Sequence, residues 1–275
     1  MNQTPLTAAS LHDALAELPP ALAQGLAARA ALRTLPLLDV WLAYDEAAAM
    51  PTVLPTLRPL STAWTAALEA AGATGPAGII ASADLGLLSA AIDAAVKQAT
   101  RAVSLATSVV AHTEANETFA YARMAFSAAV RAAYAFSGSA DRYAATRAIV
   151  HIAETINDWP SIAADLDQAR NALAEEGGLS RWLMHTPLWP GDKPEWAEPF
   201  WDWMRARLLK REGENWQVWT DWYDARLDPA TARLGHQPVD LKREKARALL
   251  PEAVWNTDAT TVNREIARII SAPRE

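Results

Sequence analysis

The sequence contains no cysteine, which excludes disulfide bonds, thiolate metal ligands and a cysteine nucleophile. Glycine is scarce as well, at 11 of the 275 residues. The chain has no Gly-x-Gly-x-x-Gly motif, Walker loop, nucleophile elbow or His-Glu-x-x-His motif. It therefore shows none of the common signatures of nucleotide binding, serine hydrolysis or zinc proteolysis.

A long uncharged apolar run and an excess of positive charge are also missing. The best candidate for a membrane span, residues 79–110, is interrupted by Asp84, Asp93, Lys97 and Arg101, and the first residues do not resemble a signal peptide. The formal net charge is -7, which disfavours binding to nucleic acid or anionic lipid. We therefore expect a cytoplasmic protein that binds neither nucleic acid nor a membrane.

The alternation of period two that marks a half-buried strand is absent, and the periodicity that is present is helical. The longest apolar stripe, between Ser82 and about His112, consists of Leu85, Leu88, Ile92, Val96, Ala99, Val103, Ala106 and Val110. Because proline removes a backbone donor, we expect Pro51, Pro55 and Pro59 to break the chain before a helix at about 61–71. Other helices are expected at about 7–18, 21–35, 37–50, 115–137, 140–158, 162–175, 195–211, 214–227, 239–250 and 260–270.

Tryptophan is concentrated in one part of the chain. Of the 12 tryptophans, eight lie close together: Trp182, Trp189, Trp196, Trp201, Trp203, Trp216, Trp219 and Trp222. Alanine becomes rarer after Gly177, while tryptophan and proline become more frequent. We predict an all-α protein in which a bundle of long alanine-rich helices, residues 1–176, packs against a smaller tryptophan-rich helical subdomain, residues 177–275, as one unit.

The tryptophan cluster predicts either a second hydrophobic core or a surface for a partner, and the sequence leaves both interpretations open. Trp222 lies off the stripe formed by Trp216, Trp219 and Tyr223, and Arg226 follows it by four residues and can stack on its indole. Our hypothesis is a non-enzymatic interaction module, without a cofactor, that presents a groove or aromatic patch to a protein partner or to a second copy of itself. Its expected partner-binding residues, with Trp222 the foremost, are Trp201, Trp203, Trp219, Trp222 and Arg226.

Two alternatives remain open, an enzyme of an unrecognised helical class and a structural homo-oligomer. Helical bundles can bind metals through glutamates and Glu-x-x-His pairs. This chain offers His112, Glu114, Glu117 and a His151–Glu154 pair in the reverse order, with no second pair, so we predict no metal site. We expect Asp202, Asp221, Asp224 and the basic segment 240–247 to lie on solvated helix faces.

Three segments carry a resemblance: Arg29-Ala-Ala-Leu-Arg33-Thr-Leu-Pro36, Pro187-Leu-Trp189-Pro and Trp216-Gln-Val-Trp219-Thr-Asp-Trp222-Tyr223-Asp-Ala-Arg226-Leu227. They are similar to segments of alanine-rich, tryptophan-containing helical proteins of proteobacteria. The resemblance implies no activity, site or cofactor. It does imply that residues 1–275 form one recurrent unit.

Overall fold

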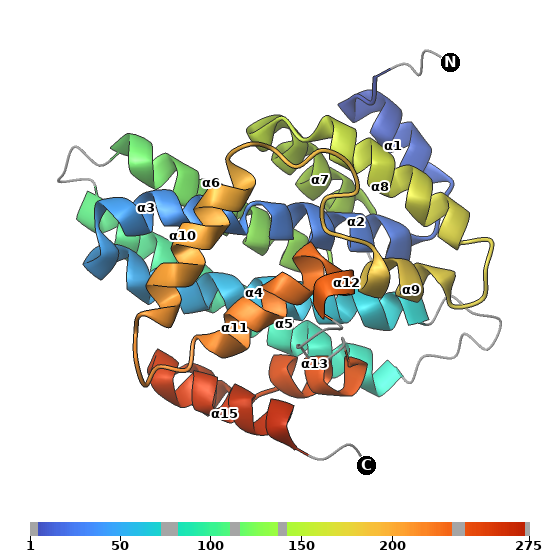
Figure 1. Cartoon of the computed structure of the whole chain (residues 1–275). Coiled ribbons are helices and arrows are strands. Elements are labelled where there is room, and N and C mark those ends of the chain that lie inside the picture. Colours follow the sequence, from blue (N-terminus) through green and yellow to red (C-terminus); the bar gives the residue numbers. More distant parts are fainter. Residues whose placement is uncertain (1–4, 73–81, 111–115, 137–141, 233–239, 273–275) are drawn as a thin grey trace.

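The computed structural model describes residues 5–72, 82–110, 116–136, 142–232 and 240–272. Within these ranges the chain forms helices and no strand, which confirms the all-α prediction (Figure 1). Helices occupy well over half of the chain. Their bounds are α1 Ala8–Ala16, α2 Pro20–Arg33, the 3-10 turn η1 Leu35–Leu37, α3 Leu38–Tyr44, α4 Glu46–Gly72, α5 Ser82–Val110, α6 Asn116–Tyr134, α7 Arg142–Ile156, α8 Trp159–Ala172, α9 Gly178–His185, α10 Ala197–Leu209, α11 Gln217–Leu227, α12 Pro229–Ala232, α13 Leu241–Ala248, α14 Glu252–Trp255 and α15 Ala259–Ser271.

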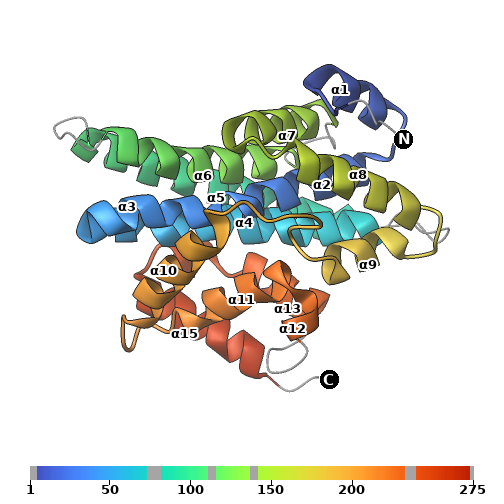
Figure 2. The same ribbon diagram turned by 45° about the horizontal axis from the view of Figure 1, so that its top comes forward.

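The helix α4 lies at the centre of the molecule. It packs against α2, α3, α5 and α6 of the bundle and also against α9 and α13 of the tryptophan-rich part. Figure 2 shows α10, α11, α13 and α15 on one side of the row formed by α3 and α4, with α6 and α7 on the other side. Side chains from both parts join one hydrophobic core, in which Leu22 and Trp64 of the bundle pack in the same cluster as Trp219 and Ile266.

The expectation that prolines interrupt the chain before residue 61 is wrong, because Pro51, Pro55 and Pro59 all lie inside α4. Every residue from 52 to 68 is buried, so this helix is covered on all sides. A proline inside a helix costs about 3 kcal/mol. Burying a side chain of the size of leucine contributes about 1.5–3 kcal/mol, and α4 buries many such side chains. Tertiary packing therefore outweighs the local preference of proline to end a helix.

The apolar stripe of α5 faces the core at each of its residues whose side chain is described. Leu88, Ile92, Val96 and Ala99 are all buried, as the periodicity predicts. The other members of the stripe, Leu85, Val103, Ala106 and Val110, lie outside the described side chains. Helix α6 packs against α4 and α5, and its alanines at 122, 125, 128, 129, 132 and 133 are buried; such small side chains allow long helices to approach closely.

Several boundaries differ from the expected ones. Helix α8 begins at Trp159, before the expected start at about residue 162. The composition change at Gly177 coincides with a left-handed backbone (φ 64°) that glycine adopts readily, directly before α9. None of the described helices is both long enough and apolar enough to cross a membrane.

Candidate functional site

The predicted partner-binding residues occupy very different environments. The side chain of Trp203 is 55% exposed, whereas Trp201, Trp219, Trp222 and Arg226 are buried. Of the patch expected from these residues, the structure therefore leaves only Trp203 on the surface. Trp222, the foremost of the expected partner-binding residues, is 4% exposed.

The three buried indoles among these residues, those of Trp201, Trp219 and Trp222, donate hydrogen bonds to side chains of the protein. The Nε1 group of Trp222 donates to Glu244 Oε2 at 3.0 Å, and that of Trp219 donates to Asn263 Oδ1 at 2.8 Å. Trp201 Nε1 donates to Asp224 Oδ1 at 2.7 Å. A tryptophan whose N–H is paired can be buried without the cost of an unsatisfied donor. Asp224 is therefore an internal acceptor and not, as expected, part of a purely solvated face.

Arginines and tryptophans alternate in a stack that joins α4, α11 and α13. The guanidinium carbon of Arg226 lies 4.1 Å from the ring centroid of Trp222 and 5.0 Å from that of Trp64. Arg247 lies 5.5 Å from both Trp222 and Trp219. The predicted stacking of Arg226 on Trp222 is thus confirmed. Cation–π contacts in a desolvated site contribute about 2 kcal/mol or more, so this stack stabilises the junction of the two parts.

The carboxylate of Glu244 forms ion pairs with both arginines of the stack. Its Oε1 lies 2.9 Å from Arg226 Nη2 and 3.5 Å from Arg247 Nη2. Two buried guanidinium groups and one buried carboxylate leave a net charge of +1. Burial lowers the pKa of Arg226 to about 10 and also lowers the pKa of Arg247, although Glu244 opposes both shifts. The interpretation of segment 240–247 as a solvated face is therefore wrong for Glu244 and Arg247, which face inward.

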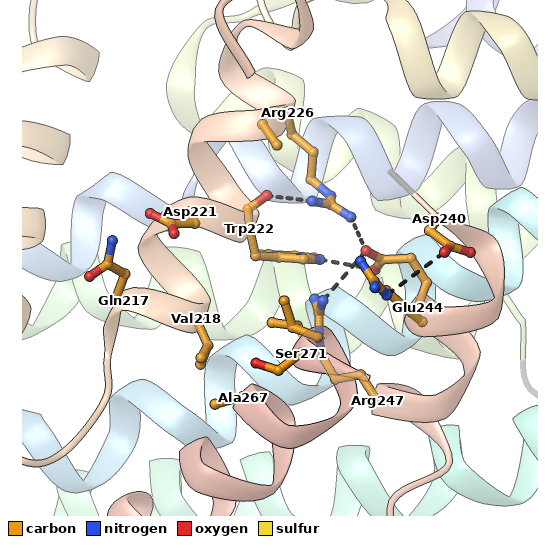
Figure 3. A pocket seen from close by; sticks show the side chains of 13 residues that line it. Gln217, Val218, Asp221, Trp222, Arg226, Asp240, Glu244, Arg247, Ala267 and Ser271 are labelled. Carbon is orange, nitrogen blue, oxygen red and sulfur yellow. Dashed lines mark hydrogen bonds and ion pairs between the residues drawn. The ribbon is translucent and has the colours of Figure 1, made fainter. Parts of the chain in front are cut away.

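A cavity of about 250 Å³ opens between α11, α13 and α15, directly against this stack (Figure 3). Its apolar walls come from Val218, Trp222, Ala225, Ala267 and Ile270. Gln217, Asp221, Arg226, Asp240, Arg243, Glu244, Arg247 and Ser271 complete the lining. Within the described part of the chain, Nε and Nη1 of Arg247 are buried and have no hydrogen-bond acceptor. The cavity therefore combines apolar walls with a buried cation whose donors are not satisfied.

A row of aromatic rings leads from the interior to Trp203, and we call Trp196, Phe200 and Trp203 the aromatic ridge. The ring centroids of Trp196 and Phe200 are 6.0 Å apart, and those of Phe200 and Trp203 are 5.9 Å apart. The inner end of the ridge contacts the buried Trp189, 6.2 Å from Trp196 and nearly perpendicular to it. Phe200 and Trp203 lie on one face of α10, and Trp196 is the residue directly before this helix.

A second arginine–tryptophan assembly brings together residues 29–36 and 187–190, two of the three segments in which we noted a resemblance to proteobacterial proteins. Arg29 and Arg33 of α2 both bind the buried Asp165 of α8, and Arg33 also binds Asp158 at 3.2 Å. Their remaining donors bind backbone carbonyls of residues 186–188. Trp182 lies 5.0 Å from the guanidinium of Arg29 and Trp189 lies 5.3 Å from that of Arg33. All of these side chains are buried, so we assign the assembly a structural role.

The candidate metal ligands form no cluster among the residues that the structure describes. His112 and Glu114 lie outside the described residues, and so does the side chain of Glu117. His151 Nε2 lies 3.2 Å from Ser127 Oγ, and burial together with the nearby charge of Arg131 lowers the pKa of His151. Among the residues with described positions, no three histidine or acidic side chains are arranged to hold a metal ion.

Comparison with known proteins finds no counterpart for this chain. No family model matches it, and neither the curated proteins nor the solved structures contain a match. The resemblance to alanine-rich proteobacterial proteins therefore stays a prediction.

Sequence reasoning missed the two cavity residues Glu244 and Arg247 and the stacking partner Trp64. Glu244 and Arg247 sit in a polar segment whose charges are typical of a surface helix, and Trp64 lies far away in α4. One local signal was available, since Glu244 and Arg247 are three residues apart and so share a face of α13. Nothing in the sequence indicates that this face is the buried one.

Proposed function

We propose that this protein is a non-enzymatic interaction module that binds a protein partner through the aromatic ridge, with Trp203 as the anchoring side chain. The observation that carries the proposal is the 55% exposure of Trp203 in a chain that buries its neighbour Trp201. A large indole left in water is unfavourable, and tryptophan is among the residues that most often dominate binding energy at interfaces.

The surroundings of Trp203 support this role. Pro199 and Ala206 are exposed on the same side of α10 and add apolar surface beside the indole, while Arg207 and Lys210 place positive charge on that side. Phe200 supports the ring from within the ridge. The opposite side of α10 is fixed by the buried Trp201, Met204 and Leu208. An anchor held on a rigid helix loses little conformational entropy on binding.

The experiment places a photoreactive phenylalanine analogue at position 203 of the full chain in cells. The matched control carries the same analogue at Tyr121 of α6, which is 46% exposed on the bundle. We expect a protein cross-linked at position 203 and not at position 121. Purified partner should then bind the wild-type chain and lose at least about tenfold in affinity for Trp203→Ala.

The protein partner can be a second copy of this chain. Sedimentation velocity on wild-type and Trp203→Ala protein tests this form, because a dimer held by the ridge dissociates when the indole is removed. Identical cross-links at positions 203 and 121, together with unchanged sedimentation of Trp203→Ala, would overturn the proposal.

A further inference from the structure

We propose that the cavity between α11, α13 and α15 binds a small organic monocarboxylate, with the carboxylate directed to Arg247 and the apolar body against Val218, Ala267 and Ile270. This site is separate from the aromatic ridge and does not depend on the proposed function. It differs from the ridge in kind, because it is concave, partly charged and too small for a protein segment.

The excess positive charge at the floor of the cavity favours an anionic ligand. Glu244 is the one carboxylate that contacts both Arg226 and Arg247 there. Arg226 also donates to the carbonyl of Trp222 and is enclosed by two indoles, although its Nε has no acceptor among the described residues. Arg247 is satisfied less well, since its contact with Glu244 is 3.5 Å long and its Nε and Nη1 have no acceptor among the described residues. A guanidinium keeps its charge at neutral pH, and its planar fork matches a carboxylate.

The mouth of the cavity restricts the anion to a single charge. Asp221, Asp240 and Arg243 are the charged lining residues that are only half-buried, and Arg243 Nε lies 3.8 Å from Asp240 Oδ2. The cavity lining as a whole thus balances three arginines against three acids, with the excess positive charge at the buried floor and the excess negative charge at the mouth. A dianion such as phosphate is repelled at this entrance more strongly than a monoanion.

The walls and the volume define the rest of the ligand. Val218, Ala267 and Ile270 offer apolar surface next to the indole of Trp222, and Figure 3 shows Val218 and Ala267 on the side of this indole away from Arg226. The volume of about 250 Å³ lies just under the usual range for ligand pockets. A carboxylate with a short alkyl chain or one aromatic ring has this size and this division between charge and apolar surface.

Isothermal titration calorimetry with benzoate and hexanoate tests the site on the full chain. We expect saturable binding of at least one of these acids, and binding at least about tenfold weaker for the neutral benzamide and for inorganic phosphate. Arg247→Gln should weaken carboxylate binding by about tenfold or more. Because that variant alters the stack, a second variant leaves the arginines intact: Ala267→Phe fills the cavity, and Ala267→Ser is its matched control.

Loss of binding in Ala267→Phe and retention in Ala267→Ser would assign the ligand to this cavity. The proposal is overturned if neither acid binds at about 10 mM, well above the ligand concentration that a weak millimolar site needs. Equal binding of benzamide or phosphate would overturn the monocarboxylate assignment. Unchanged binding in Ala267→Phe would show that any observed site lies elsewhere.

Discussion

Arg29 Nε lies 3.0 Å from both carboxylate oxygens of Asp165, and both side chains are fully buried. Asp165 also accepts from Arg33, so one carboxylate of α8 neutralises two arginines of α2 together with Asp158. Other donors of these two arginines bind the backbone carbonyls of residues 186–188, in the segment between α9 and α10. Removal of this one carboxylate therefore affects both parts of the molecule.

The first prediction concerns Asp165. Asp165→Asn leaves two buried arginines with too little negative charge, and breaking a buried ion pair costs about 3–5 kcal/mol. We expect this loss in the free energy of unfolding, measured by urea denaturation. Asp167→Asn on the same helix is the control, because Asp167 is 57% exposed and pairs with Arg170 at 3.9 Å. A loss of less than about 1 kcal/mol in Asp165→Asn would contradict the prediction.

The second prediction concerns the stripe of α5. Ile92→Asp places an unpaired charge among buried side chains and should cost several kcal/mol, enough to unfold a domain of ordinary stability. Leu87→Asp, on the same helix, is the control and should fold normally, because Leu87 is 56% exposed. Circular dichroism and thermal melting distinguish the two variants. Cooperative melting of Ile92→Asp near the wild-type temperature would show that this face is not core.

The third prediction compares a buried tryptophan, Trp222, with an exposed one, Trp203. Trp222→Ala should destabilise the protein by about 3–5 kcal/mol, because it leaves a cavity in the stack and removes the hydrogen bond to Glu244. Trp203→Ala should change stability by less than about 1 kcal/mol, since most of its indole already faces solvent. Chemical denaturation measures both values. Equal effects in the two variants would remove the distinction on which the proposed role of Trp203 depends.

The fourth prediction concerns acid pH. Burial alone would raise the pKa of Glu244, but Arg226 and Arg247 outweigh burial and hold this pKa below its ordinary value of 4.5. Because the pKa is lower in the folded than in the unfolded protein, ionised Glu244 stabilises the fold above pH 4.5, and this contribution is lost as the pH falls through the folded-state pKa. Stability measured from pH 7 down to about pH 3 should therefore fall.

Glu244→Gln tests the origin of this pH dependence. The variant should be less stable at neutral pH, because two buried arginines lose their shared counter-ion, and its stability should fall less between about pH 5 and pH 3. Glu265→Gln is the control, since its pair with Arg268 is exposed at the surface of α15. A slope in Glu244→Gln as steep as in the wild type would assign the acid sensitivity to other groups.

Local patterns in the sequence were sufficient to predict the helices and some of their faces. Apolar spacing of three and four residues identified α5 and the buried side of Ile92 and Val96, because that spacing places side chains on one face of a helix. The four-residue separation of Trp222 and Arg226 likewise brought the indole and guanidinium together within a single helix. These features depend on interactions within one helix, which the sequence determines by itself.

Only the tertiary structure decided which faces are covered. Three prolines remain inside α4 because helices pack around it, and Glu244 and Arg247 are buried because α13 lies against α4 and α15. Trp201 and Trp203 are two residues apart, yet one is buried and the other is exposed, since α10 packs with one side on α3 and η1. Periodicity assigns residues to faces of a helix, but contacts between segments far apart in the chain determine which face meets solvent.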